Sequence, residues 1–129
     1  NDFFMGDVRS ADITSNCTTG YHELPIAVLI GPVTSSSGTI TAIAFKNRPH
    51  TQFIGEATAD GYSTGNGYYV FGENLTMNLA TTYFGDRTGV VYKTVVKPDV
   101  VISGKDEFVN LSADRKINYA LMWLKSIQH

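Results

Sequence analysis

The chain has 129 residues with a formal net charge of −2, and 43% of its residues are hydrophobic while 17% are charged. This length fits one domain, which buries roughly two-thirds of the surface of its unfolded form. The composition excludes a disordered chain, and the charge provides no basic surface for nucleic acid or anionic lipid. No apolar run reaches the roughly 18 residues of a membrane span, and the single cysteine, Cys17, excludes an internal disulfide framework.

The first 20 residues lack periodicity and are rich in Asp, Ser, Thr and Asn, as a surface loop is. A loop-like entry of this length is unusual at the start of a compact domain. We therefore expect one domain over 1–129, with an irregular lead over 1–20 and a folded core over 24–127. We also expect the chain to be a fragment of a larger domain.

The first half of the predicted core has the order strand, helix, strand. The continuous apolar run "LPIAVLIG" at 24–31 predicts a strand covered on both faces. The segment "GTITAIAFK" at 38–46 predicts a helix with a buried stripe of Ile40, Ile43 and Ala44. A short strand, "TQFIG" at 51–55, follows after Pro49.

The second half predicts several strands and one helix. A polar loop at 56–67 precedes strands at 68–71 and 75–84, which are joined by a hairpin turn at 72–74. Further strands are expected at 90–96 and 100–103. The last helix is expected to have Ser112 as its N-cap and a stripe of Ile117, Leu121, Leu124 and Ala120. The order predicts an α/β fold.

Three consecutive serines, Ser35–Ser37, stand at the predicted strand-to-helix turn. Unpaired N–H groups and the dipole at a helix N-terminus can stabilise an oxyanion, so a serine here can act as a nucleophile. Serine is also a preferred N-cap, so the turn alone leaves both interpretations open.

A nucleophilic serine needs a base, and the histidines are His22, His50 and His129. His22 lies in the loop-like lead and His50 follows the predicted helix beside Pro49, which favours solvated loop histidines at both positions, while His129 is terminal. No GxSxG, SxxK, HExxH or GxxxxGK[ST] motif occurs, and no cluster has metal-ligand spacing. We expect neither a metal nor a cofactor. Glu56 and the pair Asp86-Arg87 lie on predicted loops and are weaker site candidates.

The segments "PIAVLIGPVTSSSGTITAIAFKNRPHTQFIGEATADG", "LTMNLATTYFGDRTGVVY" and "VVKPDVVI" resemble the C-terminal half of the S41 serine peptidases. These are the C-terminal-processing (tail-specific) and tricorn-like peptidases. The resemblance covers roughly 25–102 and rests on the order and spacing of several motifs. It implies a ClpP/crotonase-like spiral of ββα units.

The resemblance also implies roles for individual residues. "TSSSG" at 34–38 falls on the nucleophile motif, which places Ser36 as the nucleophile and the backbone N–H of Ser37 as an oxyanion donor. The "GEATA" segment matches the following Gly-Glu-x-Thr-Ala element. Glu56, Thr58 and Gly38 are accordingly the expected substrate-binding residues.

Three positions depart from the family pattern. Thr39 replaces an acidic residue that commonly ends the nucleophile motif. The lysine base of the processing branch falls on Gly61, and a glutamate of the tricorn-like branch falls on Tyr92. A Ser/Lys dyad is therefore disfavoured, and a base would come from outside this chain.

The leading hypothesis is a serine-type peptidase that cleaves peptides or protein C-termini through Ser36. The alternative is a catalytically inactive S41-like module that binds peptides or proteins, and a crotonase-like acyl-CoA enzyme ranks last because no clustered Lys/Arg is present. By analogy with relatives we expect an exported or envelope location. Exposed apolar edges of a truncated domain predict a possible homodimer.

Overall fold

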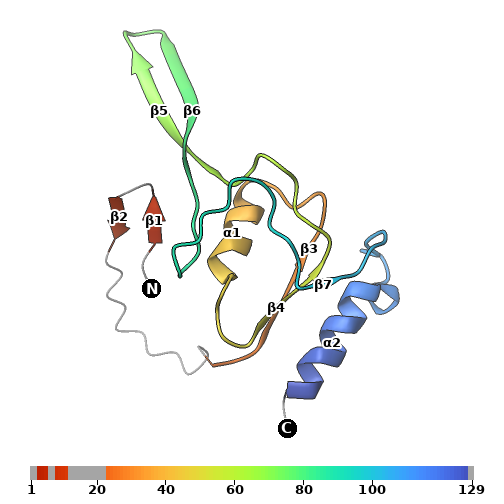
Figure 1. Ribbon diagram of the computed structural model, residues 1–129. Helices are drawn as coiled ribbons and strands as arrows, with labels where there is room; N and C mark the ends of the chain where they lie inside the picture. The colour runs from red at the N-terminus through yellow and green to blue at the C-terminus, as the bar shows by residue number, and fades with distance from the viewer. Residues whose placement is uncertain (1–2, 6–7, 12–22, 128–129) are drawn as a thin grey trace.

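The computed structural model describes residues 3–5, 8–11 and 23–127 and shows a mixed α/β domain (Figure 1). Its centre is a three-stranded sheet in the order β3-β4-β7, formed by Ile26–Ile30, Thr51–Gly55 and Val100–Val101. All three strands run parallel, with Ile26 opposite Thr51 and Ile54 opposite Val100. The predicted strands at 24–31 and 51–55 are confirmed, but the expected cover on both faces of the first strand is wrong, because Leu29 is 42% exposed. Strand β7 forms the first half of the predicted strand at 100–103.

Helix α1 (Ser37–Phe45) connects β3 to β4 and contributes to the hydrophobic core. The predicted helix is confirmed, but its buried face consists of Thr39, Ala42 and Ile43, while Ala44 is exposed. The helix is short and consists almost entirely of apolar or small residues, so its sequence does not show clearly which face is buried. The core cluster on this side comprises Ile30, Ala42, Ile43, Phe53, Phe84 and Val96.

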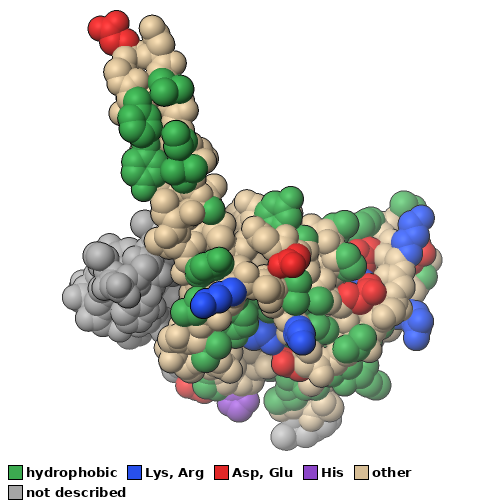
Figure 2. Space-filling view, turned by 45° about the horizontal axis from the view of Figure 1, so that its top comes forward, with side chains coloured by type: hydrophobic (Ala, Val, Ile, Leu, Met, Phe, Trp, Pro, Cys, Tyr) green, Lys and Arg blue, Asp and Glu red, His purple; other side chains and the backbone are tan. Residues whose placement is uncertain are grey.

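Strands β5 (Thr64–Phe71) and β6 (Leu75–Tyr83) form a long antiparallel hairpin that projects from the body of the molecule (Figure 1). The hairpin and its turn at 72–74 are confirmed, but β5 begins at Thr64, so the preceding loop is shorter than predicted. Figure 2 shows hydrophobic side chains gathered along this arm. The exposed large hydrophobic side chains of the arm are Tyr68, Tyr69, Val70, Phe71, Leu75, Met77, Leu79 and Tyr83.

The predicted strand at 90–96 is wrong. The segment makes one isolated bridge, between Gly85 and Val91, and otherwise has no ladder. Its end is held by Thr58, whose backbone N–H donates to the Val96 carbonyl at 3.1 Å and whose hydroxyl accepts from the Val96 N–H at 2.9 Å. β-Branched composition predicted a strand, but loop contacts satisfy the backbone of Val96 instead.

Helix α2 (Arg115–Ile127) confirms the predicted last helix but corrects its cap. Asp114, and not Ser112, accepts the first N–H groups, from Lys116 at 2.8 Å and Ile117 at 3.0 Å. Ser112 lies in the preceding 3-10 turn, Leu111–Ala113, and its hydroxyl instead donates to Oδ1 of Asn110, the residue before that turn. The predicted stripe is also partly wrong, because Ala120 is buried but Leu121 is 50% exposed.

The irregular lead is corrected in part. Two short strands, β1 (Phe3–Met5) and β2 (Val8–Ala11), pair antiparallel within the segment 1–20. The remainder of that lead, including Cys17, lies outside the described residues.

Candidate functional site

Ser36 stands between β3 and α1, and it is exposed. Its backbone has φ 50° and ψ −124°, an unfavourable conformation for a residue with a side chain. Such a conformation costs on the order of 1–3 kcal/mol and is found at active sites, where a sharp strand-to-helix turn exposes a nucleophile. The Ser36 side chain makes no cap hydrogen bond. The simple N-cap interpretation therefore does not explain this residue.

Thr34 fixes the turn that carries Ser36. Its hydroxyl accepts from the Gly31 N–H at 3.0 Å, and its own N–H donates to the Gly31 carbonyl at 2.8 Å. The Thr34 carbonyl accepts from the Thr39 hydroxyl at 3.2 Å and from the Ala59 N–H at 3.0 Å. These bonds join the end of β3, the first turn of α1 and the loop after β4, so the position of the serine turn is set by three parts of the chain.

The first turn of α1 offers donors beside Ser36. The Ser36 carbonyl accepts the N–H of Ile40 at 3.0 Å, and the Gly38 N–H donates to the Ser35 carbonyl at 2.9 Å. The Ser37 N–H has no acceptor within the part of the chain that the structure describes. A free N–H at a helix N-terminus is suited to binding a developing oxyanion.

Two of the described basic side chains, His50 and Lys46, lie away from the serine turn. The His50 carbonyl accepts the N–H of Ile26 at 2.8 Å, and His50 directly precedes β4, so it lies at the end of the sheet where the strands begin. Ser36 comes after the opposite, carboxyl end of β3, and the five residues of that strand span about 16 Å. Lys46 lies beyond the C-terminal end of α1 and pairs with Asp99 at 3.3 Å. His22 and His129 lie outside the described residues.

Lys116 is a buried cation near the end of β3, with its side chain 6% exposed. Its Nζ lies 2.7 Å from Oδ1 of Asp106 and 3.5 Å from Oε2 of Glu56. Burial alone would lower the pKa of Lys116, but the hydrogen bond and charge of Asp106, followed by those of Glu56, outweigh burial and raise it. The ammonium is held protonated, which suits an ion-pair role and not proton abstraction.

The structure gives the three predicted substrate-binding residues different contacts. Glu56 pairs with Lys116, and Thr58 is buried and bonded to Val96. Gly38 lies in the first turn of α1, where a Cβ would meet the Thr34 methyl at 3.5 Å. Gly38 comes two residues after Ser36 along the chain, and Thr58 precedes Ala59, whose N–H donates to the Thr34 carbonyl of the serine turn. Substrate contact by all three residues stays a prediction.

The described residues contain no cluster of His, Cys, Asp and Glu that could hold a metal ion. In the same part of the chain, no helix combines the length and apolar composition needed to cross a membrane.

A sequence model of peptidase family S41 matches residues 6–102. The chain belongs to peptidase family S41. The nisin-resistance protein of Lactococcus lactis subsp. lactis is 36% identical over 79 residues, covering 60% of this chain and 24% of that protein. A solved lipoprotein structure from Streptococcus agalactiae matches with a TM-score of 0.63 and 32% identity, covering 80% of this chain and 32% of the other. The chain thus spans roughly a quarter to a third of the length of these relatives.

Family membership confirms the resemblance inferred from the motifs and gives the three departures a physical context. Thr39 is fully buried and donates to Thr34, so it supports the serine turn from inside. Gly61 has φ 79° in an exposed loop. The Tyr92 hydroxyl donates to Oδ2 of Asp86 at 2.8 Å. In this S41 chain, two of the three positions therefore take part in side-chain hydrogen bonds that hold the fold.

The sequence reasoning missed the ion cluster of Lys116, Asp106 and Glu56. The first turn of α2 begins with Arg115 and Lys116 and has the polar sequence of a solvated helix start. Its residue pattern does not indicate that Lys116 is buried. The Asp114 cap had a signal, because an aspartate directly precedes the helix in "SADRK".

Proposed function

We propose that this chain is part of the catalytic domain of an S41 serine peptidase in which Ser36 is the nucleophile. The Ser36 hydroxyl attacks a peptide carbonyl while a base outside the described residues takes its proton. Collapse of the tetrahedral intermediate breaks the C–N bond, the base returns the proton to the leaving amine, and an acyl-enzyme remains for water to hydrolyse. The Ser37 N–H and the N-terminal end of α1 stabilise the oxyanion.

One observation carries the proposal: Ser36 is exposed, has a positive φ and makes no cap hydrogen bond at the start of a helix. A serine that only caps a helix adopts an extended backbone and directs its oxygen to a helix N–H. The strained alternative, held by the Thr34 bonds, is better explained by a requirement to present the hydroxyl outward.

Family membership supports the proposal that this unit belongs to a larger catalytic domain. We propose that the α/β unit is the C-terminal portion of a ClpP/crotonase-like spiral, as the βαβ arrangement of β3, α1 and β4 suggests. The short coverage of both relatives supports a larger parent domain that supplies the base. The lipoprotein relative supports an exported or envelope location.

The proposed substrates are peptides or protein C-termini. Within the described residues, β3 pairs on one side only, with β4, and we propose that an extended peptide pairs with its other edge. Nisin, for which the Lactococcus relative is named, is the first peptide to test. A homodimer stays a prediction of the exposed apolar surface.

The second candidate is an inactive S41-like module that binds peptides. The observation that favours it is the ion pairing of Lys116, which withholds the buried lysine near the serine turn from base catalysis. This module would retain the binding surface and lack the chemistry.

A fluorophosphonate probe separates the two candidates. We expect labelling of the complete gene product at Ser36, loss of labelling in Ser36→Ala, and retention in the matched control Ser35→Ala, with peptide mapping of the modified residue. Labelling that persists in Ser36→Ala would exclude Ser36 as the nucleophile. An unlabelled complete protein with intact peptide binding would establish the inactive module.

A further inference from the structure

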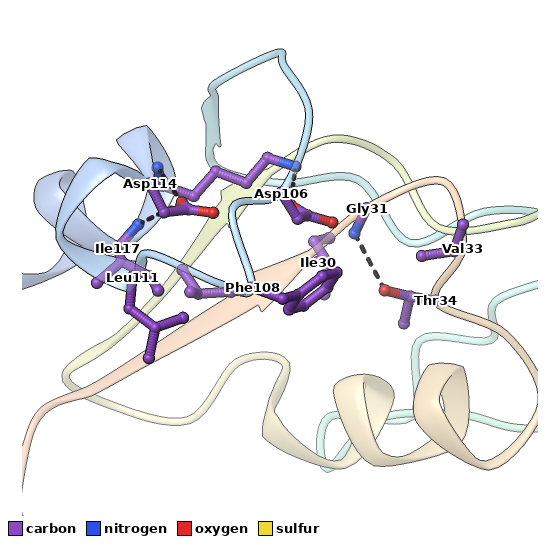
Figure 3. Close-up of a pocket in the computed structure, with 11 residues that line it drawn as sticks. Ile30, Gly31, Val33, Thr34, Asp106, Phe108, Leu111, Asp114 and Ile117 are labelled. Atoms are coloured by element: carbon purple, nitrogen blue, oxygen red, sulfur yellow. Dashed lines mark hydrogen bonds and ion pairs between the residues drawn. The ribbon is translucent and has the colours of Figure 1, made fainter.

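A cavity of about 230 Å³ lies at the end of β3, between the strand and the segment that leads into α2. Figure 3 shows Phe108 reaching across it toward Ile30, with Leu111 and Ile117 on one side and Val33 and Thr34 on the other. The remaining lining residues are Leu29, Gly31, Asp106, Asp114 and Lys116. In parallel α/β sheets, ligands bind in the crevice beyond the carboxyl ends of the strands, which is where this cavity lies.

The walls of the cavity are apolar, and its charged groups are already engaged. Lys116 is paired with Asp106 and Glu56, as described above. The Asp114 carboxylate accepts the N–H groups of Glu107, Lys116 and Ile117 at distances of 2.8 to 3.0 Å. One cation among three carboxylates leaves a surplus of negative charge. The cavity is therefore suited to an uncharged apolar group and disfavours an anion.

Thr34 connects this cavity to the serine turn. It lines the cavity and also supplies the hydrogen bonds that fix the turn. Ser36 follows two residues later, and two residues of extended chain span at most about 7 Å. A peptide whose carbonyl lies at Ser36 therefore has its neighbouring side chains within reach of the cavity.

We propose that this cavity binds an aliphatic side chain, such as leucine, of the substrate residue next to the scissile bond. The proposal rests on the proposed peptidase function and names a specificity site for it. The volume decides the class of occupant, because pockets for whole small molecules run to roughly 300–1,000 Å³, whereas this one suits a single side chain. The site discriminates by apolar contact and by exclusion of acidic side chains.

The direct test is an NMR titration of the chain with capped peptide amides. The probes are Ac-Ala-Ala-Leu-Ala-NH₂ and the analogues with Gly, Asp or Lys in place of Leu. We expect the leucine peptide to shift the amide signals of Gly31, Leu111 and Ile117 and to bind at least about fivefold more tightly than the glycine peptide. The aspartate peptide should bind no better than glycine. Equal binding of leucine and glycine, or preference for aspartate or lysine over leucine, would overturn the proposal.

The chain offers a matched pair of variants for this test. Phe108 is 80% exposed and lines the cavity, while its neighbour Val109 is 101% exposed and does not. Both truncations to Ala should leave the fold intact, as far-UV circular dichroism will show. We expect Phe108→Ala to weaken leucine-peptide binding about fivefold and Val109→Ala to change it less than about twofold. Equal effects of the two variants would count against the cavity.

A peptidyl phosphonate separates failure of this proposal from failure of the proposed function. Diphenyl phosphonates with an isobutyl or a hydrogen side chain react with active serine peptidases, so their relative rates at Ser36 of the complete gene product, which includes the base, report the preference of the neighbouring site. Equal rates would refute the cavity proposal and leave the nucleophile in place. If neither reacts at Ser36, the nucleophile assignment fails, and the NMR titration alone decides whether the cavity binds leucine.

Discussion

Asp86 offers the most demanding test of how the loop after β6 is held. The residue is 3% exposed, and its carboxylate accepts hydrogen bonds from the side chains of Asn47, Thr88 and Tyr92 and from the N–H groups of Thr88 and Val90. The donor–acceptor distances run from 2.7 to 3.2 Å. One side chain thus joins the end of α1 to the turn at 86–92. The perturbation is Asp86→Ala.

The loss of unfolding free energy expected for Asp86→Ala depends on which of its hydrogen-bond donors would stay buried without a partner. Hydrogen bonds to a charged group are worth about 1.5–3 kcal/mol each. Asn47, Thr88 and Val90 are exposed and regain water, whereas Tyr92 is half-buried and loses a partner at 2.8 Å. We therefore expect Asp86→Ala to cost about 2–4 kcal/mol, which is less than the sum of five bonds. Tyr92→Phe removes a single donor and should cost about 1 kcal/mol.

The pH dependence provides an independent check. Burial raises the pKa of Asp86, but hydrogen bonds from the Thr88 and Tyr92 side chains, and then from backbone N–H groups, outweigh burial and lower it. The stabilisation is therefore present above the unfolded-chain value of about 3.9 and is lost as pH falls through the lower folded value. At the alkaline end, burial and then Asp86 raise the pKa of Tyr92. The contribution of Tyr92 to the free energy of unfolding is therefore complete below its unfolded-chain pKa of about 10, and it is lost as the pH rises through the higher pKa of the folded state.

Urea unfolding followed by circular dichroism at several pH values measures both the stability lost in Asp86→Ala and the dependence of that loss on pH. Asp86→Asn is the matched control, because it keeps the side-chain size but cannot titrate. The double variant with Tyr92→Phe gives the coupling energy, expected to be about 1 kcal/mol. A loss below about 0.5 kcal/mol for Asp86→Ala, or a loss that stays constant from pH 7 to pH 3, would refute the reasoning, since surface changes are usually within about that size.

Three further predictions concern stability and use the same unfolding assay. Thr58→Val should cost about 1–3 kcal/mol because it orphans the N–H of Val96, while Thr58→Ser should be milder; equal losses would argue against the hydroxyl bond. Asp114→Ala should cost about 1–2 kcal/mol through the lost helix cap, and Ser112→Ala should stay within about 0.5 kcal/mol; the reverse order would restore Ser112 as the cap. Gly55→Ala should cost more than about 3 kcal/mol, because a Cβ would clash with the backbone oxygen of Ile30 and the residue has φ 123°; a smaller loss would contradict the strand geometry.

Local patterns predicted those elements whose signals are local. The apolar run before Gly31, the short strand ending at Gly55 and the hairpin turn at 72–74 all carry strong composition signals, and all three are confirmed. The strand predicted at 90–96 is wrong because its β-branched residues carry the same composition signal, whereas Thr58 forms hydrogen bonds with both backbone groups of Val96.

The sequence by itself determined the family, the α/β class and the position of the serine turn, because motif order and short-range periodicity depend on neighbours along the chain. Only the tertiary structure showed that Ser36 has a positive φ and makes no cap bond. It also brought Lys116, Asp106 and Glu56 together and formed the cavity beside Thr34. These features join residues far apart in the chain, and Glu56 and Lys116, for example, are separated by 60 positions. Their burial and charge balance depend on packing, which no local pattern encodes.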